Sequence, residues 1–212
     1  MRPTARRAGW RELREAALNA VRWGWPVVPG TFLGPDQRWY GREGARMLGP
    51  IQDSWRENPI TDPAEAYEVW SEHPYGVLLV CGRGVDVLEL PQRLRGLLAF
   101  PEVPQVPLAM TAPPVRWLLV TATGSGALSG ELARAGVRLH TAGAWVALPP
   151  TTVGFLSPQR WLEPPQHPGT RRLRTADEVQ HGLLTALLRS RLGTGPGNDD
   201  EECPHGSPAP RP

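Results

Sequence analysis

Two carboxylates on one expected strand are the residues best suited to do chemistry in this chain. Asp86 and Glu89 lie in VDVLELP, which follows an apolar segment and a short glycine-rich turn. A pair of carboxylates can hold the divalent ions that activate a nucleophile and neutralise phosphate groups. Such a pair should stand two residues apart, because side chains alternate between the faces of a strand. Glu89 comes three residues after Asp86, so we expect the two to point to opposite faces.

Each carboxylate also has a structural interpretation. Asp86 could hydrogen-bond to nearby backbone where its strand begins. Glu89 could pair with an arginine or be solvated on the open face of a sheet. Other carboxylates, such as Asp53 or Glu131, would be needed to complete a metal site, and nothing in the sequence places them there.

Several basic side chains could bind a nucleotide or a nucleic acid. Arg83 stands between two glycines, but the turn of residues 82–84 is too short to count as a phosphate-binding loop. Arg116 could contact a nucleic-acid backbone, although an exposed strand arginine is the simpler interpretation. His140 and His73 could be ligands, whereas single histidines at the ends of strands and helices are usually structural or solvated.

Aromatic and acidic clusters offer two further candidates. Trp39, Trp55 and Trp145 could stack nucleic-acid bases, but core packing is the favoured interpretation for Trp145. The segment DDEECPH, residues 199–205, has the composition of a metal-binding cluster. Solvent-exposed charge is the simpler interpretation of that segment.

Composition limits the class of protein. The 212 residues are enough for one domain with a tail, and 40% hydrophobic residues can form a core. A net charge of +2 predicts no strong basic footprint for nucleic acid. The chain has no lysine; arginine suits phosphate contacts, but a GC-rich coding sequence would give the same composition. Without a signal peptide or an apolar run that could span a membrane, we expect a cytoplasmic protein with no membrane partner.

The elements that must position these residues follow from apolar spacing and capping residues. We expect helices over residues 10–23, 62–72, 129–136 and 175–192. We expect strands over residues 25–30, 76–80, 85–90 and 115–121, and a hairpin formed by residues 137–140 and 144–148. Long loops are expected over residues 32–59 and 91–114, the second with room for a short helix.

These elements alternate without a regular βαβ rhythm. An α+β domain over residues 10–193 is therefore the expected fold. Residues 194–212, GTGPGNDDEECPHGSPAPRP, have no face that could pack, and we expect a disordered acidic and proline-rich tail.

Taken in order, several segments resemble the N-terminal domain of bifunctional DNA primase/polymerases, the prim-pol branch of the archaeo-eukaryotic primase superfamily. ALNAVRWGWPVVPG resembles that family's opening helix and its GWPVFP strand. ITDPAEAYEVWSEHPYGVLLVCGRG resembles the next helix and strand, and GAWVALPPT, followed by Arg160-Trp161, resembles a late strand and its signature. The resemblance covers roughly residues 10–165. It extends to short, stand-alone actinobacterial members, which commonly read FDVLDVP where this chain has VDVLELP.

The resemblance implies a fold, partners and a cofactor. The fold would be an N-terminal α/β portion followed by a sheet with helices on one face. DNA or nucleotides would be the partners. In active members, Mg²⁺ or Mn²⁺ is held by two aspartates two residues apart on one strand and a third acidic residue elsewhere. A histidine in a glycine-rich segment on a later strand helps hold the incoming triphosphate.

The residues of this chain match that pattern only in part. If Asp86 takes the first acidic position, the second falls on Leu88, and if Glu89 takes it, the second falls on Pro91. The segment comparable to the histidine-bearing one is TAPPVRWLLV, with Trp117 where the histidine would stand. We therefore expect a catalytically degenerate primase/polymerase-like domain that retains nucleotide or nucleic-acid binding, with Asp86 and Glu89 as residual catalytic and metal-binding positions.

Two other functions stay open. The chain could be an active but divergent metal-dependent nucleotidyltransferase, which would need a rebuilt carboxylate site. It could also be a non-enzymatic scaffold for protein interactions, with residues 32–59 or the acidic tail as its contact surface.

Overall fold

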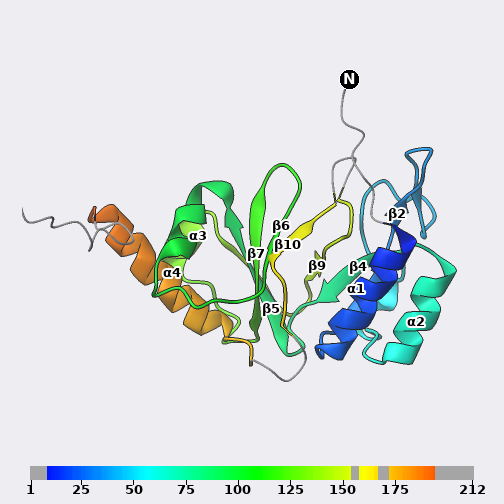
Figure 1. Cartoon of the computed structure of the whole chain (residues 1–212), viewed down its shortest axis with the longest axis horizontal. Helices are drawn as coiled ribbons and strands as arrows, with labels where there is room; N and C mark the ends of the chain where they lie inside the picture. Colours follow the sequence, from blue (N-terminus) through cyan, green and yellow to red (C-terminus); the bar gives the residue numbers. More distant parts are fainter. Residues whose placement is uncertain (1–8, 154–157, 167–171, 194–212) are drawn as a thin grey trace, which may run out of the picture.

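A computed structural model describes residues 9–153, 158–166 and 172–193, and its helices flank two antiparallel sheets (Figure 1). One sheet has three strands in the order β1-β4-β9, and the other has five in the order β10-β6-β7-β5-β8. The predicted α+β fold is confirmed. The expected tail, residues 194–212, lies outside the described residues.

The three-stranded sheet packs against two N-terminal helices. In the first helix, Leu13, Ala17, Ala20 and Val21 recur at helical spacing and are buried. The second helix begins where the Asp62 side chain accepts hydrogen bonds from two backbone N–H groups of the first turn. The elements are α1 (Trp10–Arg22), β1 (Val27–Gly30), α2 (Pro63–Glu72), β4 (Gly76–Val80) and β9 (Trp145–Ala147).

The five-stranded sheet carries its helices on one face (Figure 1). The last helix begins at Thr175, whose side chain forms the predicted capping box with Glu178. The strands are β5 (Val85–Pro91), β6 (Leu108–Met110), β7 (Arg116–Ala122), β8 (Arg138–His140) and β10 (Arg160–Glu163). The helices are the 3-10 helix η2 (Gln92–Ala99), α3 (Gly130–Arg134) and α4 (Ala176–Arg191).

The two long loops contain more structure than the sequence indicated. Residues 32–59 include a small hairpin of β2 (Phe32–Leu33) and β3 (Trp39–Tyr40) and a 3-10 turn, η1 (Asp53–Arg56). The second loop holds η2 and the strand β6. The eight residues of η2 are the short helix for which the second loop had room, whereas the other elements have two to four residues and are too short to produce a recognisable period.

The predicted hairpin of residues 137–140 and 144–148 is wrong. Strand β8 pairs with β5 in the five-stranded sheet, and β9 pairs with β4 in the other. The turn between them, closed by a 2.9 Å hydrogen bond from Ala144 N to Thr141 O, therefore carries the chain from one sheet to the other. Each short strand thus extends the edge of a larger sheet, where it is supported by the packed strands beside it, whereas an isolated two-stranded hairpin is marginally stable.

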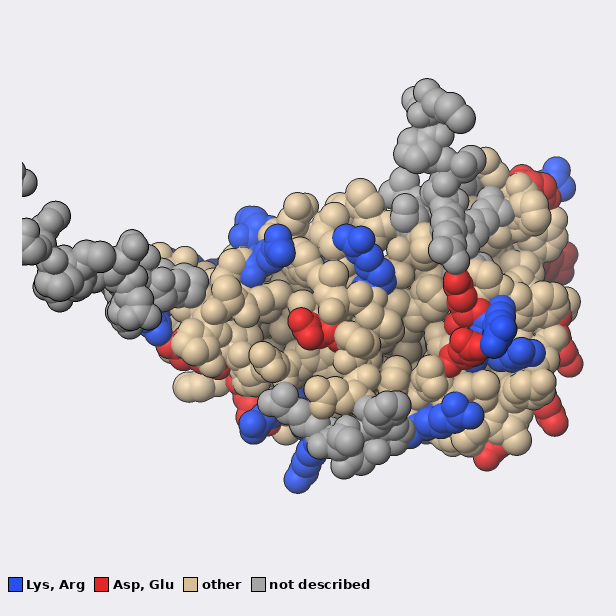
Figure 2. Space-filling view, viewed as in Figure 1, with Lys and Arg blue, Asp and Glu red and all other residues tan. Residues whose placement is uncertain are grey.

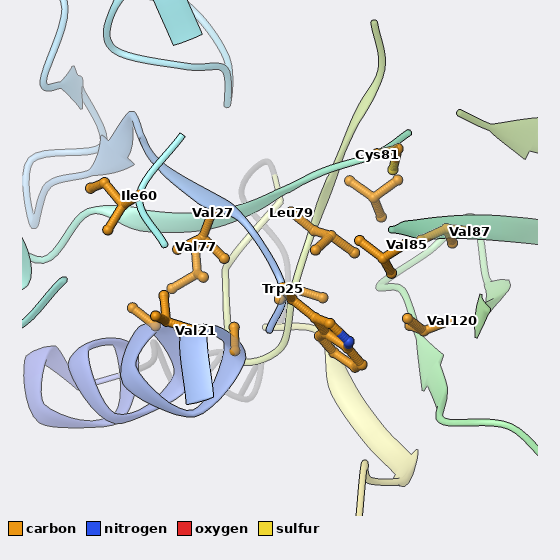
Figure 3. Close-up of a cluster of buried hydrophobic side chains, with 14 of the residues drawn as sticks. Val21, Trp25, Val27, Ile60, Val77, Leu79, Cys81, Val85, Val87 and Val120 are labelled. Atoms are coloured by element: carbon orange, nitrogen blue, oxygen red, sulfur yellow. The ribbon is translucent and has the colours of Figure 1, made fainter. Parts of the chain in front are cut away.

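A shared core joins the two sheets. Trp25 is 4% exposed and lies between Val21 and Leu79 on one side and Val85 and Val120 on the other (Figure 3). A second core, on the opposite face of the five-stranded sheet, joins β5 and β7 to α4 and η2. Strand β5 is therefore buried on both faces over most of its length.

Candidate functional site

The register of β5 separates the two candidate carboxylates. Asp86 lies opposite Thr121 of β7, and Glu89 lies opposite Leu118 of β7 and Arg138 of β8. Residues directly opposite share a face, and successive residues alternate. Asp86 and Glu89 therefore point to opposite faces of the sheet, as the three-residue spacing predicts.

Asp86 is fully buried and bonded to backbone. Its Oδ1 accepts a 3.0 Å hydrogen bond from Gly82 N, and its Oδ2 accepts a 3.4 Å one from Gly124 N. The Asp86 carbonyl oxygen accepts a hydrogen bond from the Thr121 hydroxyl at 3.2 Å. The Asp86 carboxylate thus connects the turn before β5 to the loop after β7 through hydrogen bonds. This agrees with the structural interpretation of Asp86, in which it hydrogen-bonds to nearby backbone.

Glu89 lies within a cluster of three cationic or ionisable side chains, Arg116, Arg138 and His140, which we call the Glu89 cluster. Its Oε2 is 2.6 Å from His140 Nε2. Its Oε1 forms an ion pair with Arg116 Nε and lies 3.8 Å from an Arg138 guanidinium nitrogen. Arg116 is fixed further by a 3.1 Å hydrogen bond to the Gly136 carbonyl. The structure thus brings together Glu89, Arg116 and His140, which the sequence named separately.

Burial and charge act in opposite directions on Glu89. Its side chain is only 12% exposed, and burial alone raises the pKa of a carboxyl group. The hydrogen bond with His140 and the positive charges of the cluster outweigh burial and hold the pKa of Glu89 below its ordinary value. Two guanidinium groups against one carboxylate leave the cluster with a net charge of +1 when the imidazole is neutral.

Arg138 is the member of this cluster that sequence reasoning missed. It lies opposite Glu89 and is 68% exposed, the most accessible of the four side chains. The signal was its position two residues before His140, because residues two apart on a strand share a face. That signal becomes useful only once β8 is known to lie beside β5.

Other residues singled out in the sequence lie away from this cluster. An Arg83 guanidinium nitrogen donates a 2.6 Å hydrogen bond to the Arg56 carbonyl. His73 stacks on Phe32, with ring centroids 6.3 Å apart. Trp117, at the position compared with the family's histidine, faces the core beneath α4 and so points away from Glu89.

The three tryptophans considered for base stacking gather on the outer face of the three-stranded sheet. Trp55 is buried, and Trp39 and Trp145 are partly buried against the same apolar cluster. An Arg56 guanidinium lies 4.4 Å from the Trp55 ring centroid. The three tryptophans therefore pack as part of a small hydrophobic core, and their rings have little exposed area on which a nucleic-acid base could stack.

The described residues do not fit a divalent metal centre. Asp86 and Glu89 lie on opposite faces, and both oxygens of Glu89 face cationic or ionisable groups that would compete with a metal ion. Asp53 is exposed and pairs with Arg42 at 2.8 Å, and Glu131 lies on α3. Within the part of the chain that is described, no group of three or more His, Cys, Asp or Glu side chains is arranged to hold a metal. The acidic segment 199–205 lies outside it.

The surface in Figure 2 gives no broad basic area for nucleic acid. Charged side chains on this face are scattered among neutral ones. On the face in view, phosphate binding would therefore depend on individual charged groups and not on a basic area.

Comparison with known proteins gives one match. The family model Prim-Pol, described as bifunctional DNA primase/polymerase, N-terminal, matches residues 17–178, about three quarters of the chain. No curated protein matches. Among the described helices, none combines the length and the apolar character needed to cross a bilayer.

Proposed function

This chain belongs to the bifunctional DNA primase/polymerase N-terminal family, and we propose that it is a catalytically degenerate member that still binds nucleotide phosphates. The observation that carries this proposal is the Glu89 cluster. One of the two candidate carboxylates, Glu89, is surrounded by Arg116, Arg138 and His140. The other, Asp86, is fully bonded to backbone.

Loss of polymerase chemistry follows from these contacts. Members of the family are typically metal-dependent, and two divalent ions need carboxylate oxygens that are free to coordinate them. Removing either carboxylate from its present partners would leave unpaired groups in a partly or fully buried place, which is costly. We therefore expect no efficient phosphodiester bond formation.

Retained binding follows from the same side chains. A guanidinium group presents a planar fork of N–H donors that matches phosphate oxygens, and an imidazole adds a further donor. Arg138 is exposed enough to receive a ligand, while Arg116 and His140 are about a quarter exposed. A phosphate would compete with Glu89 for these donors, so binding should persist without a metal.

Isothermal titration tests the binding. A nucleoside triphosphate and a short single-stranded DNA would each be titrated into the protein in EDTA and then in MnCl₂. We expect triphosphate binding in both buffers, weakened about fivefold to tenfold by Arg138→Gln, which removes one charge-assisted hydrogen bond. Glu89→Gln should strengthen it, because the competing carboxylate is gone.

The matched control is Arg160→Gln, an exposed arginine on β10 of the same sheet that is not part of the cluster. Equal loss of affinity in Arg138→Gln and Arg160→Gln would point to nonspecific attraction and contradict the proposal. So would the absence of heat with both ligands. Binding of DNA alone would move the ligand from a free nucleotide to a nucleic-acid strand.

A further inference from the structure

A cavity of about 590 Å³ lies away from the Glu89 cluster, where the end of α1 meets the edge of the five-stranded sheet. Trp23 and Trp25 form one wall, with ring centroids 5.0 Å apart at an angle of 56°. The other walls come from the segment 103–108 before and within β6, the segment 163–166 at the end of β10, and residues 172–174 before α4.

The lining combines an apolar interior with charges of both signs. Leu98, Leu108 and Leu119 contribute to the interior beside the two indole rings. Glu163 and the exposed side chains of Arg172 and Arg174 add charge. Aromatic-lined grooves of this kind bind proline-rich segments, because a polyproline II helix is extended before it binds and loses little entropy.

We propose that this cavity binds the chain's own proline-rich segment, residues 208–212, PAPRP. Alternate prolines would present rings to the partly exposed indole of Trp23, and Arg211 would face the carboxylate of Glu163. The acidic run DDEE at residues 199–202 is opposite in sign to Arg172 and to Arg174, whose guanidinium also pairs with Glu178 at 3.2 Å. Both charge relations favour the same occupant.

The chain outside the described residues is long enough to reach. The wall of the cavity at Pro104 packs against α4, where a Cβ built on Gly182 would lie 3.0 Å from Pro104 Cδ. The adjoining Glu102 forms an ion pair with Arg189. From Gly182 to Gly193 the helix rises about 16 Å, and residues 194–207 could span about 43 Å in polyproline II form. The segment can therefore turn back along α4 and enter the cavity.

A spin label on Cys203 tests this docking in the full chain. Cys81 is 2% exposed, and burial raises the pKa of its thiol to about 12, so a thiol reagent should modify Cys203 alone in the native protein. The readout is the loss of intensity in the indole N–H signals of Trp23 and Trp25. Trp10, about 20 Å from Trp23 at the other end of α1, serves as the internal reference.

Docking predicts that Trp23 and Trp25 lose most of their intensity while Trp10 keeps most of its own. The double variant Pro208→Ala/Pro210→Ala should restore both signals, whereas the matched variant Pro196→Ala should not. Equal loss at all three indoles, no loss, or loss unchanged in the double variant would overturn the proposal. A second sample would mix isotope-labelled protein that carries no spin label with spin-labelled protein that carries no isotope. Loss of the Trp23 and Trp25 signals in this mixture would also overturn the proposal, because the segment would then come from a second copy of the chain.

Discussion

At the scale of single residues, the neighbours of Glu89 decide what its carboxylate can do. A carboxylate in water or beside another carboxylate is a metal ligand. The same group between Arg116 and His140 is an internal counter-ion that holds cationic side chains in place. In the proposed function, Glu89 is the counter-ion that a bound phosphate would displace, so its replacement should act first on stability and anion affinity.

The lowered pKa of Glu89 predicts a pH dependence of stability. Because folding lowers this pKa from its ordinary value of 4.5, the stabilisation is fully present above that value and is lost as pH falls through the folded value. At pH 7, Glu89→Gln should lower the free energy of unfolding by about 2 kcal/mol. The difference between the two proteins should shrink as pH falls below 4.5.

Urea unfolding of both proteins across this range is the measurement. Lowered carboxyl pKa values at Asp36, Glu102 and Glu178 are common to both proteins and cancel in the difference. A difference that stays constant with pH would show that Glu89 is not charged in these ion pairs.

Asp86 and Val87 are neighbours on β5, and both are fully buried, but they should respond differently to substitution. Val87→Asp would bury an unpaired charge in the core between the sheets, at a cost of about 3–5 kcal/mol. Asp86→Asn keeps an oxygen for Gly82 N and loses the bond to Gly124 N, at about 1–3 kcal/mol. The melting temperature should therefore fall much further in Val87→Asp than in Asp86→Asn. Equal melting temperatures would contradict the different roles given to the two side chains.

Residue roles could be predicted from the sequence where they depend on local geometry. The opposite faces of Asp86 and Glu89 follow from strand alternation alone. The contact of Glu89 with His140 could not be predicted, because 51 residues separate them and only the pairing of β5 with β8 brings them together.

At the scale of elements, the turn between β4 and β5 determines how the chain leaves one sheet and enters the other. Gly82 and Gly84 both have positive φ, at +83° and +86°. An added Cβ at Gly82 would lie 2.4 Å from Ala142 Cα, whereas at Gly84 it would meet nothing within 4 Å. The turn of residues 82–84 thus packs directly against the turn between β8 and β9.

This pair of glycines provides a matched experiment. Gly84→Ala should cost about 1 kcal/mol, the strain of a left-handed conformation. Gly82→Ala adds a clash with backbone that cannot move aside easily, so we expect about 3 kcal/mol in total. Chemical denaturation of the two variants measures the difference, and equal losses would mean that the two turns are not in contact.

Element boundaries and caps were predictable, but pairing was not. The starts of α2 at Asp62 and of α4 at Thr175 depend on residues within one turn, so the sequence contains the whole signal. The pairing of β8 and β9 depends on strands far away in the chain. The short connection between β8 and β9 favours a hairpin. Their actual partners, β5 and β4, could not be recognised from the residues of this segment alone.

At the scale of the whole molecule, the two sheets form one body through the core around Trp25 (Figure 3). The Glu89 cluster lies on the same sheet face as this core, at the other end of β5. Strand β5 is packed on both faces over most of its length, and a rebuilt metal site would require it to rearrange. The architecture thus keeps the family fold and stabilises the cationic arrangement.

A primer synthesis and extension assay on the purified protein shows directly whether the site is catalytically degenerate. The assay would use mixed nucleotides with Mg²⁺ or Mn²⁺, with Glu89→Gln beside the unaltered protein and circular dichroism to confirm that both are folded. We expect no product from either protein. Product from the unaltered chain that disappears in Glu89→Gln would show that Glu89 serves an active metal-dependent site, and it would contradict the assignment of a degenerate one.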